Sequence, residues 1–145
     1  MSEASKATAS CLCGAVKITV SGDHKEVGAC HCTMCRRWGG GPGIAVYVGK
    51  DPLTIEGGDN VGVYRSSDWA ERGFCKTCGS NLFYRLVEAG DHYLYAGLFD
   101  DQDDFAMTTQ VFIDEKPGYY AFANETKNMT GPEIFAMFAP PAEQP

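Results

Sequence analysis

The chain carries seven cysteines, and they fall into three short clusters. The clusters read Cys11-Leu12-Cys13-Gly14, Cys30-His31-Cys32-Thr33-Met34-Cys35-Arg36 and Phe74-Cys75-Lys76-Thr77-Cys78-Gly79-Ser80. Zinc takes four ligands at the corners of a tetrahedron with zinc–sulfur bonds of about 2.3 Å, which places the sulfurs roughly 3.8 Å apart. Cysteines two or three residues apart can reach that distance, so the clusters predict metal binding.

Two kinds of spacing bring the thiols together. In an extended Cys-x-Cys segment, which we expect at Cys11 and Cys13, both side chains project from one face. In Cys-x-x-Cys-Gly the chain turns back on itself, and the glycine provides the left-handed conformation that the turn needs. We therefore expect Cys75 and Cys78 to form a zinc knuckle that ends at Gly79.

The count of seven divides naturally into four and three. A closed structural zinc site uses four protein ligands, whereas a catalytic zinc has three and keeps one position open. The middle cluster is a local triple, while the outer clusters join distant parts of the chain. This predicts an open site at Cys30, Cys32 and Cys35 and a closed site at Cys11, Cys13, Cys75 and Cys78.

Two other interpretations of the cysteines fit less well. A Cys-x-x-Cys pair is a redox centre in thioredoxin-like proteins, but there it lies near a βαβ unit, and no such pattern flanks Cys75. A disulfide framework conflicts with the odd number of cysteines and with a reducing cytosol. The first ten residues lack the apolar core of a secretion signal, so we expect a cytoplasmic protein.

The elements that would position the cysteines are mostly β-strands. Runs rich in β-branched and aromatic residues alternate with glycine turns, which predicts antiparallel strands at Val16–Val20, Gly43–Val48, Leu53–Ile55, Val61–Arg65, Asn81–Arg85, Tyr93–Ala96 and Gln110–Ile113. Helices should be few and short. We expect them directly after Cys32, around Asp100–Phe105 and at Pro132–Phe138, where the proline suits a first helical turn.

Length and charge limit the remaining possibilities. The 145 residues suit one domain, which we place at residues 11–138. Residues 1–10 and the proline-rich residues 139–145 have no periodic pattern and are predicted to be disordered. The net charge is −7 without a basic stripe, which disfavours nucleic acid and anionic membranes as partners. No apolar run approaches the roughly 18 residues that a membrane-spanning helix needs.

The three clusters, read as CxCG, CHCxxCR and FCxxCGS in this order, resemble the glutathione-dependent formaldehyde-activating enzyme (GFA) family, also called the centromere protein V domain family. The similarity covers roughly residues 10–125. It implies an Mss4-like β-tent fold of small antiparallel sheets organised around zinc. It also implies two zinc ions, a structural one on Cys11, Cys13, Cys75 and Cys78, and a labile catalytic one on Cys30, Cys32 and Cys35.

The resemblance further implies a carbon–sulfur lyase whose partners are a small thiol, such as glutathione, and a small aldehyde. The family activity joins glutathione and formaldehyde into S-hydroxymethylglutathione. An open zinc position can lower the pKa of a thiol or polarise an aldehyde oxygen. His31 is the candidate for proton transfer, although its alternation with the neighbouring cysteines points it away from the metal and favours a packing role.

Two other functions remain open from the sequence. One is a zinc-stabilised module that binds another protein without catalysis, with a purely structural middle cluster. The other is a cysteine-based reductase on a similar scaffold, which would need a metal-free cysteine. For the enzyme, the acidity of glutathione requires a local basic pocket, and the candidates are Arg36, Arg37 and Arg72.

Overall fold

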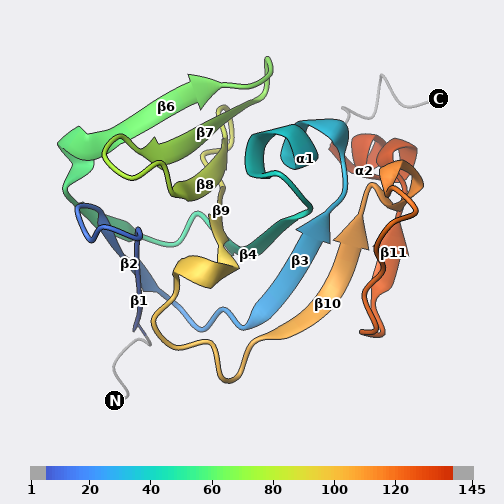
Figure 1. Cartoon of the computed structure of the whole chain (residues 1–145), viewed down its shortest axis with the longest axis horizontal. Helices are drawn as coiled ribbons and strands as arrows, with labels where there is room; N and C mark the ends of the chain where they lie inside the picture. The colour runs from blue at the N-terminus through green and yellow to red at the C-terminus, as the bar shows by residue number, and fades with distance from the viewer. Residues whose placement is uncertain (1–5, 139–145) are drawn as a thin grey trace. The chain divides into compact units, whose positions relative to one another are not determined.

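A computed structural model describes residues 6–138 of the chain. Within these residues the chain forms eleven β-strands, two short α-helices and three 3-10 turns, which confirms the predicted β class (Figure 1). The described residues divide into two compact units, and the single domain at residues 11–138 stays a prediction. The first unit holds the residues up to Glu26 and Ala45–Ala106, and the second holds Val27–Ile44 and the residues from Met107 onward.

The first unit contains a three-stranded antiparallel sheet in the order β1 (Lys6–Ser10), β2 (Lys17–Ser21) and β5 (Leu53–Glu56). We predicted disorder over residues 1–10, and for residues 6–10 this prediction is wrong. The small residues of β1 carry no strong strand signal, but pairing with β2 supplies their hydrogen bonds, and Ala9 is almost fully buried. Residues 1–5 and 139–145 lie outside the described part of the chain.

The same unit contains a longer run of antiparallel strands. Their order is β4 (Gly43–Gly49), β9 (His92–Tyr95), β8 (Asn81–Leu86), β7 (Ala70–Cys75) and β6 (Val61–Arg65). The register aligns one cross-strand row that consists of Tyr47, Tyr93, Tyr84, Arg72 and Tyr64. The adjacent positions Val46, Leu94 and Phe83 are buried and form core.

Close packing explains a glycine in β7. A Cβ atom at Gly73 would lie 2.4 Å from the ring of Phe83 on the neighbouring strand, so only glycine fits there. We did not predict β7, because its charged residues break the apolar alternation. Arg72 nevertheless lies in the strand, with its guanidinium 4.9 Å above the ring of Tyr84.

The second unit contains the strands β11 (Lys127–Met129), β10 (Ala106–Val111) and β3 (Glu26–Cys30), in this order. Figure 1 shows β3 and β10 side by side. The pair β10 and β11 is parallel, which is an exception to the predicted antiparallel pattern. The strands β3 and β11 were not predicted, and the strand predicted at Gln110–Ile113 begins four residues later than β10 and ends two residues later.

Two of the three predicted helices exist. Helix α1 (Thr33–Gly39) follows Cys32 and ends at Gly40, whose φ of 84° is left-handed. Helix α2 (Gly131–Phe138) begins beside Thr130 and Glu133, which hydrogen-bond each other's backbone amides as a capping box.

The third predicted helix, around Asp100–Phe105, is wrong. The segment forms a turn in which Asp101 accepts a hydrogen bond from the amide of Asp103. The remaining 3-10 turns are η1 (Gly58–Asn60), η2 (Ala96–Leu98) and η3 (Ile113–Glu115). None of the helices in the described chain has the length and apolar character needed to cross a membrane.

Candidate metal centres

The outer clusters meet in the first unit and form a four-cysteine site, Cys11, Cys13, Cys75 and Cys78, whose sulfurs all lie within 4.8 Å of one another. The Cys13 sulfur is 3.6 Å from that of Cys11 and 3.7 Å from that of Cys75, which is 62 residues away in the chain. These separations match the roughly 3.8 Å between ligands of a tetrahedral zinc–sulfur site. The donor set therefore fits a zinc ion.

The backbone around Cys11 differs from the prediction. Cys11 and Cys13 lie in a turn, not an extended segment, because the amide of Gly14 donates to the carbonyl of Cys11 at 3.1 Å. Gly14 has a φ of 83°, which allows this turn. Gly79 after Cys78 has a φ of 79° and forms the turn that we predicted for the knuckle.

Polar groups surround the sulfurs of the four-cysteine site. The amide of Val16 donates to the Cys11 sulfur at 3.3 Å, and the side-chain amide of Asn60 donates to the Cys75 sulfur at 3.1 Å. The hydroxyl of Ser80 lies 3.2 Å from the Cys78 sulfur, and hydrogen bonding by Ser80 lowers the pKa of the Cys78 thiol to about 5. These donors stabilise the thiolate form that a metal ligand requires.

The middle cluster forms a three-cysteine site, Cys30, Cys32 and Cys35, in the second unit. Its sulfurs also lie within 4.8 Å of one another. Cys30 ends β3, Cys32 caps the N-terminus of α1, and the amide of Cys35 donates to the Cys32 sulfur at 3.3 Å. Among the described residues, no further cysteine, histidine or carboxylate joins this group. The site offers three thiol ligands, a set that also fits zinc.

The protonation of the two sites differs. Hydrogen bonds with the thiols of Cys32 and Cys35, together with burial, raise the pKa of the Cys30 thiol. In the four-cysteine site, hydrogen-bond donors contact the sulfurs of Cys11, Cys75 and Cys78, and in the three-cysteine site the amide of Cys35 donates to the sulfur of Cys32. The four-cysteine site combines a thiol of lowered pKa, Cys78, with Cys13, whose pKa is raised to about 11, so a metal must displace a firmly held proton in each site.

His31 lies between two ligands but is not part of the cluster. Its ring is fully buried, its Nε2 is 2.7 Å from Oε1 of Gln110, and its Nδ1 is 2.7 Å from the hydroxyl of Tyr120. Burial lowers the pKa of His31 and favours the neutral ring. Neither partner was predicted, because Gln110 stands out in the sequence only as a polar residue in a predicted strand and Tyr120 lies in a loop without a motif.

The three candidate arginines have different surroundings. Arg36 donates from Nε to the backbone carbonyl of His31 at 2.9 Å. This hydrogen bond holds the backbone between Cys30 and Cys32. Arg37 is exposed in the last turn of α1. Arg72 is only 2% exposed and packs on Tyr84 in the first unit, so it does not present a free basic surface to solvent.

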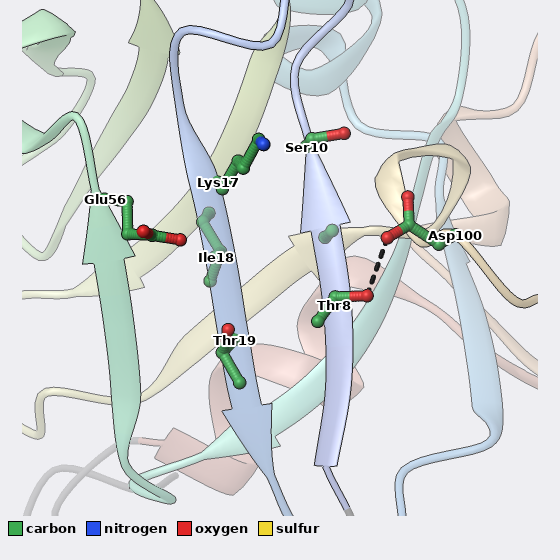
Figure 2. A pocket seen from close by; sticks show the side chains of 8 residues that line it. Thr8, Ser10, Lys17, Ile18, Thr19, Glu56 and Asp100 are labelled. Atoms are coloured by element: carbon green, nitrogen blue, oxygen red, sulfur yellow. Dashed lines mark hydrogen bonds between the residues drawn. The ribbon is translucent and has the colours of Figure 1, made fainter.

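A polar hollow of about 340 Å³ lies on the three-stranded sheet of the first unit (Figure 2). Thr8 and Asp100 both line this hollow, and Figure 2 shows the hydrogen bond that the Thr8 hydroxyl donates to the Asp100 carboxylate. Its length is 2.6 Å. Neither cysteine site contributes to its lining. The hollow therefore adds nothing to the metal chemistry.

Comparison with known proteins agrees with the cysteine pattern. The model of the glutathione-dependent formaldehyde-activating enzyme family matches residues 6–115. The chain belongs to this family. An uncharacterised lyase of Schizosaccharomyces pombe is 37% identical over 125 residues, which are 86% of this chain and 90% of that protein. The family predicted from the three clusters is thereby confirmed.

Two further relatives extend this comparison. A protein of Halomonas elongata, named as a candidate glutathione-dependent formaldehyde-activating enzyme, is 33% identical over 82 residues, about half of each chain. A crystal structure of a Rhodobacter sphaeroides protein superposes with a TM-score of 0.55 and 26% identity, covering 64% of this GFA-family chain and 87% of that one. The β architecture is therefore shared with a solved structure.

Proposed function

We propose that this GFA-family chain is a zinc-dependent carbon–sulfur lyase that interconverts a thiol plus formaldehyde with the S-hydroxymethyl adduct, with glutathione as the thiol. Family membership and relatives named as lyase and formaldehyde-activating enzyme agree with an enzyme of the carbon–sulfur lyase type. In the forward direction the sulfur–carbon bond forms, the carbonyl π bond breaks and the thiol proton ends on oxygen.

The observation that supports this proposal is the difference in ligand number between the two cysteine sites. The four-cysteine site offers enough thiols for all four positions of a tetrahedron, whereas the described residues offer three thiols at Cys30, Cys32 and Cys35. A zinc ion bound there would supply a Lewis acid able to lower the pKa of a substrate thiol or polarise an aldehyde oxygen. We therefore assign catalysis to the three-cysteine site and a structural role to the four-cysteine site.

The chain's own residues hold this site in place. The helix α1 presents Cys35 one turn after Cys32, and Arg36 fixes the backbone of His31 between the ligands. Glu115 accepts hydrogen bonds from both the amide and the hydroxyl of Thr33, at 3.0 and 3.1 Å, which fastens the start of α1 to η3. These hydrogen bonds therefore hold the backbone of the segment that carries Cys30, Cys32 and Cys35.

The experiment is a zinc titration of the full chain, followed by measurement of formaldehyde–glutathione exchange by NMR. The exchange rate should rise with the second equivalent of zinc and should vanish in Cys32→Ser. Met34→Ala is the matched control, because Met34 lies between the ligands but is 39% exposed. A rate that does not depend on zinc would contradict the proposal. Two bound zinc ions without exchange activity would instead favour a protein-binding module.

Reduction of a substrate by the cysteines of the metal-free chain would favour the alternative of a cysteine-based reductase.

The substrates of the proposed lyase are small molecules, and we propose neither a nucleic acid nor a membrane as partner. Cytoplasmic location stays a prediction from the sequence.

A further inference from the structure

The strand β6 lies at the outer edge of the sheet in the first unit, with β7 on one side only (Figure 1). Edge strands offer unpaired backbone amides and carbonyls to another strand, and proteins normally protect them with charges, prolines or covering segments. The β6 sequence, Val61-Gly62-Val63-Tyr64-Arg65, contains no proline and a single charge, at its end. Val63 and Tyr64 are both more than half exposed, so the edge carries unprotected apolar surface.

The pairing of β6 with β7 shows which backbone groups face outward. The amide of Lys76 donates to the carbonyl of Asn60 at 2.8 Å, so these two residues exchange hydrogen bonds between the strands. Such pairs alternate along an antiparallel ladder, and the register therefore turns the amides and carbonyls of Gly62 and Tyr64 toward β7. The residues whose backbone groups point away from β7 are the other three, Val61, Val63 and Arg65.

Most of these outward groups have no hydrogen-bond partner within residues 6–138. The amide of Val61 is the exception, because it donates to the carbonyl of Gly58 in the 3-10 turn η1. The carbonyl of Val61, both backbone groups of Val63 and the amide of Arg65 make no hydrogen bond in this part of the chain. The edge therefore offers amides and carbonyls in the spacing that an antiparallel strand needs.

The other edges among the described strands are shorter or partly occupied. The carbonyl of Thr8 in β1 accepts a hydrogen bond from the amide of Asp100 at 2.9 Å, and Ala9 forms a bridge to Phe99. The strand β5 follows directly on Pro52, which has no amide to donate, and β11 covers only Lys127–Met129. The edge of β6 is therefore the one that another strand can extend most easily.

We propose that β6 pairs with β6 of a second copy of this chain, antiparallel and about a two-fold axis at Val63. In this register Val63 lies opposite the second copy's Val63, and the two exchange both of their backbone hydrogen bonds. The amide of Arg65 donates to the carbonyl of the second copy's Val61, and the symmetry repeats this bond. Every amide that is free on the edge thus meets a free carbonyl. Because the contact is two-fold and each chain has one β6, the pairing closes as a dimer.

The side chains of β6 fit this self-pairing. The two-fold axis sets Tyr64 opposite the second copy's Gly62, where no side chain obstructs the approach. A Cβ atom at Gly62 would lie 2.4 Å from the ring of Phe74, so this ring covers the glycine and offers an apolar surface on which the incoming tyrosine can pack.

The charges also permit a second copy. The axis sets Arg65 opposite the second copy's Val61, so no two like charges lie directly across from each other. The Arg65 guanidinium donates to the backbone carbonyls of Ser67 at 2.8 Å and of Asp68 at 2.6 Å, in the turn after β6. These bonds hold the charge at its own turn, so an arriving strand does not have to displace it.

The first test is sedimentation equilibrium of the full chain, zinc-loaded and reduced, over a series of concentrations. The wild type should form a particle of twice the 15.7 kDa chain mass that dissociates on dilution. Val63→Pro removes the outward amide without removing a bond to β7, and should raise the Kd of the dimer at least about tenfold. Val63→Thr keeps the amide and should dimerise as wild type does. A wild type that stays a single chain at millimolar concentration would overturn the inference.

Charge variants at the axis test the pairing even if the proline variant does not fold. Val63→Lys and Val63→Asp each set two like charges opposite each other, so each alone should dimerise at least about tenfold more weakly than wild type. An equimolar mixture of the two should dimerise again, because lysine then faces aspartate. A mixture that associates no better than the separate variants would overturn the proposed register.

Amide hydrogen exchange measured by NMR locates the contact on β6. The amides of Val63 and Arg65 should exchange slowly in concentrated protein and rapidly after dilution. The amides of Gly62 and Tyr64 face β7 and should be protected at both concentrations, which makes them the internal control. A dimer in which the Val63 and Arg65 amides exchange rapidly would overturn the inference. None of these measurements uses enzyme activity, so their failure would leave the proposed function unaffected.

Discussion

The two cysteine sites differ in how far along the chain their ligands lie. The four-cysteine site joins turns whose residues Cys13 and Cys75 are 62 positions apart, so binding a metal there closes a long loop. The three-cysteine site draws all its ligands from the six residues between Cys30 and Cys35. A metal in the four-cysteine site should therefore stabilise the fold. The ligands of the three-cysteine site lie at the end of β3 and in α1, which other contacts already hold, so a metal there should add less stability.

The largest expected difference between the sites is in stability. Cys75 is fully buried, and loss of its site in Cys75→Ser should remove most of a structural zinc contribution on the order of 10 kcal/mol. Cys32→Ser should retain the fold while losing one zinc ion and the exchange activity. Thermal unfolding by circular dichroism and zinc analysis of both variants measure this. Comparable unfolding of Cys32→Ser would contradict the division of roles.

Acidification should empty the two sites in sequence. A thiol must lose its proton to bind metal, so a raised pKa weakens binding as the pH falls, and a lowered pKa preserves it. Each site has one thiol whose pKa is raised, Cys30 in one and Cys13, to about 11, in the other, but the four-cysteine site holds the ion through one more thiolate and includes Cys78, whose pKa is lowered to about 5, so the three-cysteine site should release zinc at the higher pH. A zinc-indicator titration from pH 8 to pH 4, on wild type and Cys32→Ser, measures the order. Simultaneous release would contradict it.

Two glycines with similar backbone angles allow a matched and smaller test. Gly79 follows the four-cysteine knuckle and Gly40 ends α1 beside the three-cysteine site; their φ values are 79° and 84°, and neither has an atom within 4 Å of an added Cβ. Alanine at either position should cost about 1 kcal/mol in the free energy of unfolding, from backbone strain alone. Only Gly79→Ala should also speed zinc loss to a chelator from the four-cysteine site, and equal rates in both variants would refute this.

The smallest effect concerns the start of α2 and serves as a control for acid experiments. Hydrogen bonds from the amide and hydroxyl of Thr130 lower the pKa of Glu133 below its ordinary 4.5. The resulting stabilisation is complete above that value and disappears as the pH falls through the lowered pKa. Glu133→Gln should flatten the stability profile below pH 4.5 without changing zinc release. A changed zinc profile would show that α2 is coupled to the metal.

The spacing of the cysteines indicated three local clusters of thiols, but grouping the first cluster with the third, which lies 62 positions further along the chain, came from dividing seven cysteines into four and three and from the family resemblance. The β class and α1 also followed from local patterns. The prediction failed where long-range pairing outweighs local preference. The weak β1 segment is a strand because β2 pairs with it, and β7 is a strand although Arg72 interrupts its apolar pattern.

Local sequence thus determined the three cysteine clusters and the family to which the chain belongs, since each motif spans only a few positions, whereas the tertiary structure brings the first and third clusters together. Tertiary structure alone decided that Cys11 and Cys13 lie in a turn, and that His31 meets Gln110 and Tyr120, 79 and 89 positions later. The physical reason is that a buried imidazole must satisfy both nitrogens, and which distant groups do so depends on how β10 and the loop after η3 pack against β3.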